Sequence, residues 1–330
     1  MCRRRSLTAA AIVGVVWAEA AIVSLGAQSA DSKYDSGTTV FSPKGRLYQV
    51  EYAAEAVARA RPAVGICTDE GIVLCSLKTI HNKRLQVGDQ RVKTSRVDSH
   101  VVCTSAGLAA DAMVLVKDCR ASAQQHALTF QEPIPVQKLA SHVADVKQAY
   151  TQHGGLRPWG VSMLLAGWDE SRGLQLYKTE PSGNFGAFKA VAVGAGASRL
   201  SAELAEGYRE AGNSGGGGGS SMGLGEAVRL AARVLSRERA RERKTRDIQT
   251  RAALADEPEG ESKGREAERE RERAQEEFGD IGMEIATIAV EKDGDGGAAA
   301  ASAYIYNDAD VDRVLASLEE KTDGQDGKEG

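Results

Sequence analysis

Gly37-Thr38-Thr39 is the first place in the chain where the residue types could do chemistry. A threonine at the start of a processed chain is a nucleophile, because its own free α-amine takes the hydroxyl proton and a nearby lysine favours ionisation. Cleavage after Gly37 would create such a terminus at Thr38. The segment therefore raises the hypothesis of a threonine-type peptidase, and that hypothesis depends on where the surrounding elements place the pair.

Other residues of catalytic or metal-binding type show no matching pattern. The five histidines lack the spacing of metal ligands, and the five cysteines form neither CxxC nor Cys/His motifs. Cys67, Cys75 and Cys103 stand in short apolar runs, which is typical of buried, reduced thiols. The sequence therefore predicts no metal site and no cofactor, and the thiols favour a reducing compartment.

Composition favours a folded domain of substantial size. The 330 residues are 42% hydrophobic but only 5% aromatic, so aliphatic side chains must fill the core. The chain has 42 basic and 46 acidic residues, and its net charge is -4. Such a balance argues against a dedicated nucleic-acid-binding protein, because the phosphate backbone attracts proteins with an excess of basic residues.

The first 33 residues form an extension. A basic start, an apolar run over 7–25 and small residues at 27–30 match the layout of a secretory signal peptide. Glu19 interrupts the apolar run, which disfavours both a signal core and a membrane-spanning helix. We expect a gene-model artefact or a lineage-specific tail ahead of a domain that begins at residue 34.

Residues 34–235 carry the regular patterns of a folded body. Apolar residues at helical spacing predict helices over 45–60, 109–128 and 135–153. Short apolar runs between turn residues predict strands over 63–67, 72–75, 100–105, 160–168, 173–179 and 187–193. This order of helix, strands, helices and strands is typical of a sheet sandwich covered by layers of helices.

The composition changes after this body. Five consecutive glycines at 215–219 indicate a flexible linker, and a short amphipathic helix is expected over 226–235. In residues 236–281 arginines alternate with glutamates and few apolar residues occur, which favours a solvated low-complexity insertion. Residues 282–330 hold the end of the domain and an acidic tail, with strands expected over 283–290 and 304–306 and a helix over 308–318.

Several long motifs resemble proteasome α subunits. YDSGTTVFSPKGRLYQVEYAAEA at 34–56 is similar to their N-terminal signature, and QEPIP, VKQAYTQHGGLRPWGVSMLLAGWD and GLQLYKTEPSGNFGAFKA follow in the family's order. The resemblance covers residues 34–235 and about 282–320, and it excludes the extension and the charged insertion. It implies an α+β fold, a four-layer αββα sandwich of the N-terminal nucleophile hydrolase type, in the heptameric outer ring of the 20S core particle.

The resemblance bears on the threonine pair. In the catalytic β-type subunits of the family the nucleophile begins the first strand, and the equivalent position here is Arg61, ten residues before Gly71. The supporting aspartate corresponds to Leu77, which cannot take that role. Thr38 and Thr39 lie ahead of a helix that separates them from the sheet. We therefore expect a non-catalytic subunit with no catalytic residues.

Four residues of the N-terminal signature resemble the cluster that orders the α-subunit tails at the pore. They are Tyr34, Asp35, Pro43 and Tyr52. A tyrosine hydroxyl and an aspartate of neighbouring subunits can form hydrogen bonds around a ring, and proline fixes the turn that leads into the tail. The resemblance implies a gate with two arrangements of the tails.

Lys78 matches a lysine that lines a pocket between adjacent α subunits in many members of the family. Such pockets receive the C-terminal tails of regulatory particles, where an ammonium can pair with a terminal carboxylate. Ala60, where the family usually has glycine, and the atypical Arg61-Pro62 depart from the pattern. The other reading of Lys78 is a solvated lysine at the end of a strand.

The implied partners are the other α subunits of the ring, the β ring and ATPase or other regulatory particles, in the cytoplasm and nucleus. No nucleic acid and no membrane are expected among them. Two alternatives of other classes stay open. One is an active threonine-type peptidase of the same fold, and the other is an arginine-rich nucleic-acid-binding module at residues 237–273.

Overall fold

The computed structural model describes residues 34–35, 37–80, 93–214, 222–255, 280–292 and 298–326. The predictions for the N-terminal extension, for the glycine run at 215–219 and for residues 256–279 of the insertion lie outside these ranges. The described residues hold most of the body on which the resemblance rests.

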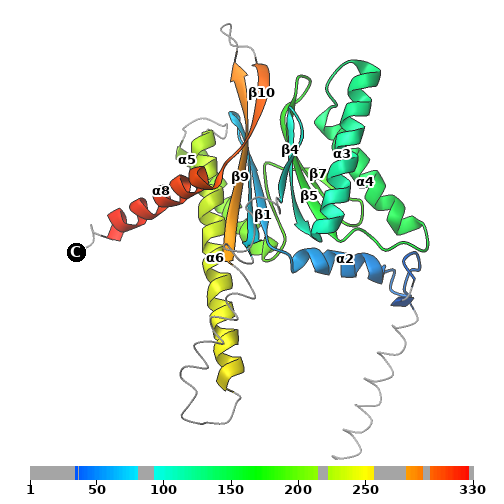
Figure 1. Ribbon diagram of the computed structural model, residues 1–330, viewed down its shortest axis with the longest axis horizontal. Coiled ribbons are helices and arrows are strands. Elements are labelled where there is room, and N and C mark those ends of the chain that lie inside the picture. Colours follow the sequence, from blue (N-terminus) through cyan, green and yellow to red (C-terminus); the bar gives the residue numbers. More distant parts are fainter. Residues whose placement is uncertain are drawn as a thin grey trace, which may run out of the picture.

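Two antiparallel sheets, each of five strands within the described residues, form the centre of the molecule (Figure 1). The first sheet has the order β10 (Ala298–Ile305), β9 (Asp280–Lys292), β2 (Gly71–Ile80), β1 (Ala63–Cys67) and β8 (Ala190–Val193). The second has the order β3 (Thr94–Asp98), β4 (Val101–Gly107), β5 (Val161–Asp169), β6 (Gly173–Thr179) and β7 (Phe185–Ala187).

Helices cover the outer face of each sheet. The first sheet is covered by α5 (Ala197–Ser214), α6 (Leu224–Ala255) and α8 (Asp308–Asp326). The second is covered by α3 (Ala109–Phe130) and α4 (Val136–Gln152), while α2 (Tyr48–Ala58) lies across one end of the sandwich (Figure 1). These layers confirm the predicted four-layer αββα sandwich.

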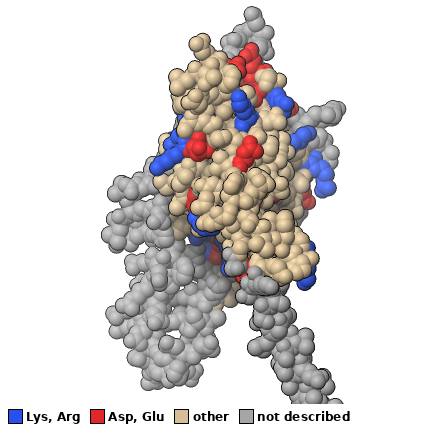
Figure 2. Space-filling view, turned by 90° about the vertical axis from the view of Figure 1, so that its right-hand side faces the viewer, with Lys and Arg blue, Asp and Glu red and all other residues tan. Residues whose placement is uncertain are grey.

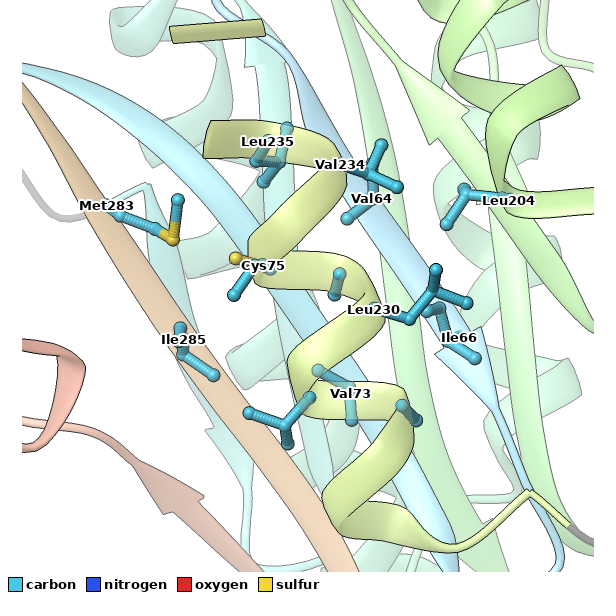
Figure 3. Close-up of a cluster of buried hydrophobic side chains, with 14 of the residues drawn as sticks. Val64, Ile66, Val73, Cys75, Leu204, Leu230, Val234, Leu235, Met283 and Ile285 are labelled. Carbon is cyan, nitrogen blue, oxygen red and sulfur yellow. The ribbon is translucent and has the colours of Figure 1, made fainter. Parts of the chain in front are cut away.

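Three apolar clusters fill the spaces between the four layers. Successive residues of a strand point to opposite faces, so in β2 Val73 and Cys75 face the helices of the first sheet while Ile72 and Leu74 face the second sheet. Figure 3 shows the helix side of this arrangement, where Leu230 of α6 lies over the strands. Because both faces of each sheet are covered, the central strands are apolar almost throughout.

The strand register brings the functional positions to one end of the sandwich. A hairpin joins β1 to β2, and Thr68 closes its turn by accepting a hydrogen bond from Gly71 N at Oγ1, at 3.2 Å. The far end of β2 pairs with the start of β9, so that Lys78 lies opposite Gly282. This end of the sheet is therefore the end to which α2 delivers the chain.

The structure differs from the sequence predictions in several elements, among them α5, for which no range was predicted, and β10, which begins at Ala298 rather than at 304. The helix expected over 226–235 continues to Ala255 as α6, and the short strands β3 and β7 were not predicted. The predicted domain boundary between residues 235 and 236 falls inside α6, and the one between 281 and 282 falls inside β9. The first part of the charged segment is thus a direct continuation of a helix that packs on the core.

The described cysteines are all free thiols. Cys75 and Cys103 are fully buried, while Cys67 is half-buried, and burial raises the pKa of the Cys67 thiol to about 11. No helix within the described ranges is both long and apolar enough to cross a bilayer. The apolar run at residues 7–25, which raised that question, lies outside those ranges.

Candidate functional site

A tight turn delivers the N-terminal signature into α2. Ser42 N donates to Arg46 O at 2.9 Å, and Arg46 N donates back to Ser42 Oγ at 3.1 Å. Gly45 has φ +73°, a left-handed conformation that favours glycine, and its N–H donates to Ser42 O. Pro43 lies exposed on this turn. The Ser-Pro-Lys-Gly-Arg motif therefore has a structural reason for its proline and its glycine.

The start of the described chain is tied to the first turn of α2. Gln49 Nε2 donates to Asp35 O at 2.6 Å. Asp35 Oδ1 is buried, and within the described residues it has no hydrogen-bond partner. Tyr34, next to it, is half-buried. A buried carboxylate oxygen that lacks a partner in the single chain is suited to accept a bond from a neighbouring molecule.

Two tyrosines lie side by side on α2. Tyr48 is buried and its ring stacks on that of Tyr52 with centroids 6.4 Å apart, while the Arg46 guanidinium lies 5.4 Å from the Tyr48 centroid. Tyr52 is half exposed. The structure thus places the predicted cluster of Tyr34, Asp35, Pro43 and Tyr52 at the α2 end of the sandwich, and it leaves Pro43 and Tyr52 at the surface.

A lysine with a desolvated ammonium, Lys93, marks the junction between α2 and β1. Its Nζ donates to Arg61 O at 2.8 Å, to Leu77 O at 3.0 Å and to Pro62 O at 3.4 Å. Desolvation lowers the pKa of this ammonium to about 7, although the carboxylate of Glu284 acts in the opposite direction. Three backbone carbonyls are therefore held by one side chain.

The position that corresponds to the nucleophile of catalytic subunits is Arg61, whose side chain has no hydroxyl group. Arg61 is inside the chain, and its side chain donates from Nε to Thr79 Oγ1 at 2.6 Å and forms an ion pair with Glu242 of α6. Leu77 is fully buried in the apolar cluster under α6. Lys93 was not among the predicted site residues, because the segments that supply its carbonyl partners meet only in the folded chain.

Lys78 lies between two carboxylates. Its Nζ is 3.6 Å from Glu284 Oε1 on β9 and 3.6 Å from Asp308 Oδ1 at the start of α8. The lysine side chain is 13% exposed and that of Glu284 8%, whereas that of Asp308 is 77% exposed. The predicted pocket residue is therefore a paired cation close to the surface rather than a freely solvated lysine.

Two acidic residues near the start of the charged segment, Glu238 and Glu242, face inward from the middle of α6. Glu238 is only 5% exposed and forms an ion pair with Arg199 of α5, and Arg241 donates to Glu203 Oε1 at 2.9 Å. The prediction of a solvated segment is therefore wrong for Glu238. Glu238 and Glu242 are one helical turn apart, so both lie on the face of α6 that meets the rest of the domain.

The described residues contain no group of three or more histidine, cysteine, aspartate or glutamate side chains arranged to hold a metal ion. Several polar side chains at this end of the molecule are instead bonded to one another and to the backbone, among them those of Arg61, Lys93 and Glu284. Their arrangement joins α2, the two sheets, α6 and α8, and it offers a paired ammonium and an exposed tyrosine face at the surface.

The layers define an α+β protein with the sandwich of the N-terminal nucleophile hydrolases. Residues 57–247 match the family model of proteasome subunits, and residues 34–56 match the model of the N-terminal signature of A-type proteasome subunits. The chain belongs to the proteasome subunit family, and it carries the α-type signature.

Relatives of known name agree with this family. The chain is 47% identical over 205 residues to the proteasome alpha type-4-1 subunit of Oryza sativa subsp. indica, and the match covers 62% of this chain and 78% of the relative. Over the same shares it is 45% identical to the alpha type-4-A subunit of Arabidopsis thaliana and 44% identical to the alpha type-4 subunit of Spinacia oleracea. These matches support neither the peptidase alternative nor the nucleic-acid-binding one.

Proposed function

We infer that this chain is a structural subunit of the outer α ring of the 20S proteasome, and that it supports ubiquitin-dependent protein degradation without catalysing it. The observation that carries the inference is the α-type signature at residues 34–56, continuous with a family body at 57–247. We propose that the chain assembles with the other α subunits of the heptameric ring and with the β ring, in the cytoplasm and nucleus.

The chemistry of the first strand supports a non-catalytic role. Arg61 offers neither a hydroxyl nor a free amine, and the Lys93 ammonium is bonded to carbonyl oxygens of the backbone. Thr38 and Thr39 precede α2, so that the helix separates them from the sheet in the chain. A threonine nucleophile needs the amine, the hydroxyl and the lysine in one place.

An epoxyketone probe that forms a covalent adduct with an N-terminal threonine tests this role. Core particles purified through this chain are treated with the probe and each subunit is analysed by intact-mass measurement. We expect adducts on other subunits of the particle, which serve as the positive control, and none on this chain. An adduct on a form of this chain that begins at Thr38 would instead establish the peptidase.

We propose that Tyr34, Asp35, Pro43 and Tyr52 help to order the N-terminal tails at the pore. Their common position at the α2 end supports this, as does the buried Asp35 Oδ1 that a neighbouring subunit could satisfy. In particles that carry Tyr52→Phe the basal hydrolysis of a small fluorogenic peptide should rise. Lys44→Ala, in the exposed turn ahead of α2, is the control, and equal rates for both variants would refute the gate.

Assembly requires surfaces that can be covered by other subunits. Figure 2 shows that the face over α3 and α4 carries few charged residues. Large apolar side chains are exposed on α3, among them Met113, Leu128 and Phe130. Apolar surface of this kind marks contacts with other proteins, which supports the proposed place in a ring assembly.

We propose, finally, that Lys78 lines a pocket that receives the C-terminal tail of a regulatory particle, where its ammonium pairs with the terminal carboxylate. The support is the position of Lys78 at the end of β2, close to the surface, and its pairing with carboxylate oxygens already within the chain. An ammonium at this position can pair with a terminal carboxylate once one of its present carboxylate partners has turned away.

A further inference from the structure

The two carboxylates beside Lys78 differ in how firmly they are held. Glu284 Oε2 accepts hydrogen bonds from Lys93 N at 3.0 Å and from Thr94 N at 2.9 Å, and the side chain is 8% exposed. Removing this carboxylate from its place would leave two backbone N–H groups without partners. Glu284 is therefore a fixed part of the fold and stays beside the lysine.

Asp308 has no comparable anchor within the described residues. Its side chain is 77% exposed, and its contact with Lys78 is the ion pair at 3.6 Å. The cap of α8 is made by the preceding residue, because Asn307 Oδ1 accepts a bond from Asp310 N at 2.9 Å. Rotation of the Asp308 side chain into water would therefore leave the helix cap intact.

Backbone hydrogen bonds fix the position of the Asp308 main chain. Tyr306 N donates to Ile285 O at 2.9 Å, which holds the end of β10 against β9 beside Glu284. Asp308 follows two residues later at the first turn of α8. The carboxylate is thus delivered to Lys78 by the fold itself, and only a side-chain rotation is needed to withdraw it.

We propose that Asp308 is a built-in competitor at the Lys78 pocket, which the terminal carboxylate of a docking tail must displace. The proposal rests on the tail pocket proposed above and adds its regulation. With Glu284 in place, Lys78 is already neutralised, and a third carboxylate next to the pair would be repelled. When Asp308 turns into solvent, the incoming carboxylate takes over its position.

The size of the effect follows from the exposure of Asp308. Ion pairs with an exposed partner are weak, because water and salt screen them. Loss of the Asp308 carboxylate should therefore tighten the binding of a tail by about twofold to fivefold. Asp308 would therefore weaken the binding of a single tail, whereas a regulator that binds through several tails would still bind tightly.

The test uses assembled core particles and a fluorescein-labelled heptapeptide with a free terminal carboxylate, with fluorescence anisotropy as the readout. Asp308→Asn removes the charge with little change in shape, and Asp308→Ala removes both oxygens. Both should bind the peptide about twofold to fivefold more tightly than the unchanged particle. Asp312→Asn removes the same charge from an exposed position on the same helix and should have no effect.

A peptide with the same sequence and an amidated C-terminus separates the carboxylate effect from general charge. Its weak binding should be the same in all four particles. If Asp308→Asn and Asp312→Asn tighten the binding equally, or if neither does, Asp308 is not a competitor.

Lys78→Met distinguishes this failure from that of the pocket itself. When Lys78→Met abolishes carboxylate-dependent binding and Asp308→Asn tightens it, the pocket and the competitor both stand. When Lys78→Met abolishes it and Asp308→Asn changes nothing, the pocket stands and the competitor is overturned. When Lys78→Met changes nothing, the tail pocket proposed above is overturned together with the competitor.

Discussion

Two lysines of this molecule, Lys147 and Lys93, have similar surroundings but connect different parts of the fold. Lys147 of α4 donates from Nζ to Val161 O at 2.9 Å and to Thr179 Oγ1 at 2.8 Å. Lys93 likewise donates to backbone carbonyls, and desolvation lowers the pKa of each lysine to about 7. Both ammonium groups therefore have their hydrogen bonds satisfied inside the protein.

The difference lies in what each lysine connects. Lys147 fastens one helix to the two strands beneath it. Lys93 holds the carbonyls that lead from α2 into β1, and its backbone N–H is bonded to Glu284, which lies beside Lys78. This end of the fold therefore forms a joint, centred on Lys93 and Glu284, between α2 and the proposed docking pocket.

The largest loss of stability is expected on removal of the Glu284 carboxylate. Glu284→Ala would remove the buried carboxylate beside Lys93 and Lys78 and should lower the free energy of unfolding by about 3–5 kcal/mol. Urea unfolding of the full-length chain measures this, with Glu170→Ala, at an exposed turn, as the control. A loss no larger than that of the control would show that the joint contributes nothing to stability.

Lys147→Met should lower the free energy of unfolding by about 1–3 kcal/mol, because the oxygens of Val161 and Thr179 lose their donor. The loss should depend on pH. The pKa of Lys147 is about 7 in the folded chain against an ordinary value of 10.5, so the unfolded chain binds the proton more tightly between these values and stability rises with pH.

The expected result is that Lys147→Met loses little near pH 6 and more near pH 9, with a change of about 1.4 kcal/mol per pH unit at most. Comparison with the unchanged chain at each pH cancels the other titrating groups. A difference that is constant over this range would mean that the lysine keeps its ordinary pKa inside the protein.

Lys93→Met and Lys147→Met should destabilise different helices, which distinguishes the two lysines. Loss of the clamp on Arg61 O and Leu77 O should increase amide hydrogen exchange in α2 by about tenfold, or about 1.4 kcal/mol of local stability. Lys147→Met should instead increase exchange in α4 and leave α2 unchanged. The two lysines would prove equivalent if both variants affected α2 to the same degree.

The smallest effect on stability is expected for the ion pair between Arg61 and Glu242 of α6. A double-mutant cycle on Arg61 and Glu242, whose side chains are 20% and 22% exposed, should give a coupling of about 1 kcal/mol. The same cycle on Arg59 and Glu55, which are 79% and 58% exposed, should give about 0.3–0.5 kcal/mol. Equal couplings would argue against a specific contact between α6 and Arg61.

Much of the fold could be predicted from local patterns. The strands over 63–67 and 173–179 coincide with β1 and β6, because each is an apolar run between turn residues. The short strand β3 escaped prediction because it exposes one face through Arg96 and carries no continuous apolar run. The helix α6 continues past Leu235, where the regular apolar pattern ends, since arginine, glutamate and alanine are strong helix formers.

The candidate site was only partly predictable, for a physical reason. The turn around Pro43 and the position of Lys78 follow from local motifs. The contact of Arg61 with Glu242 joins residues 181 positions apart, and alternating charges in a sequence do not say which charges will face the core. The role of Lys93 depends on carbonyls from separate segments, and only the folded chain brings these together.

The central claim is that this chain occupies the outer α ring as a structural subunit. Cryo-electron microscopy of core particles purified through a tag on its C-terminus tests this most directly. The predicted result is density for this chain in an outer ring, with α2 at the pore side of the ring and an uncleaved backbone through Arg61. A chain found in an inner ring with a processed terminus at Thr38, or absent from the particles, would contradict it.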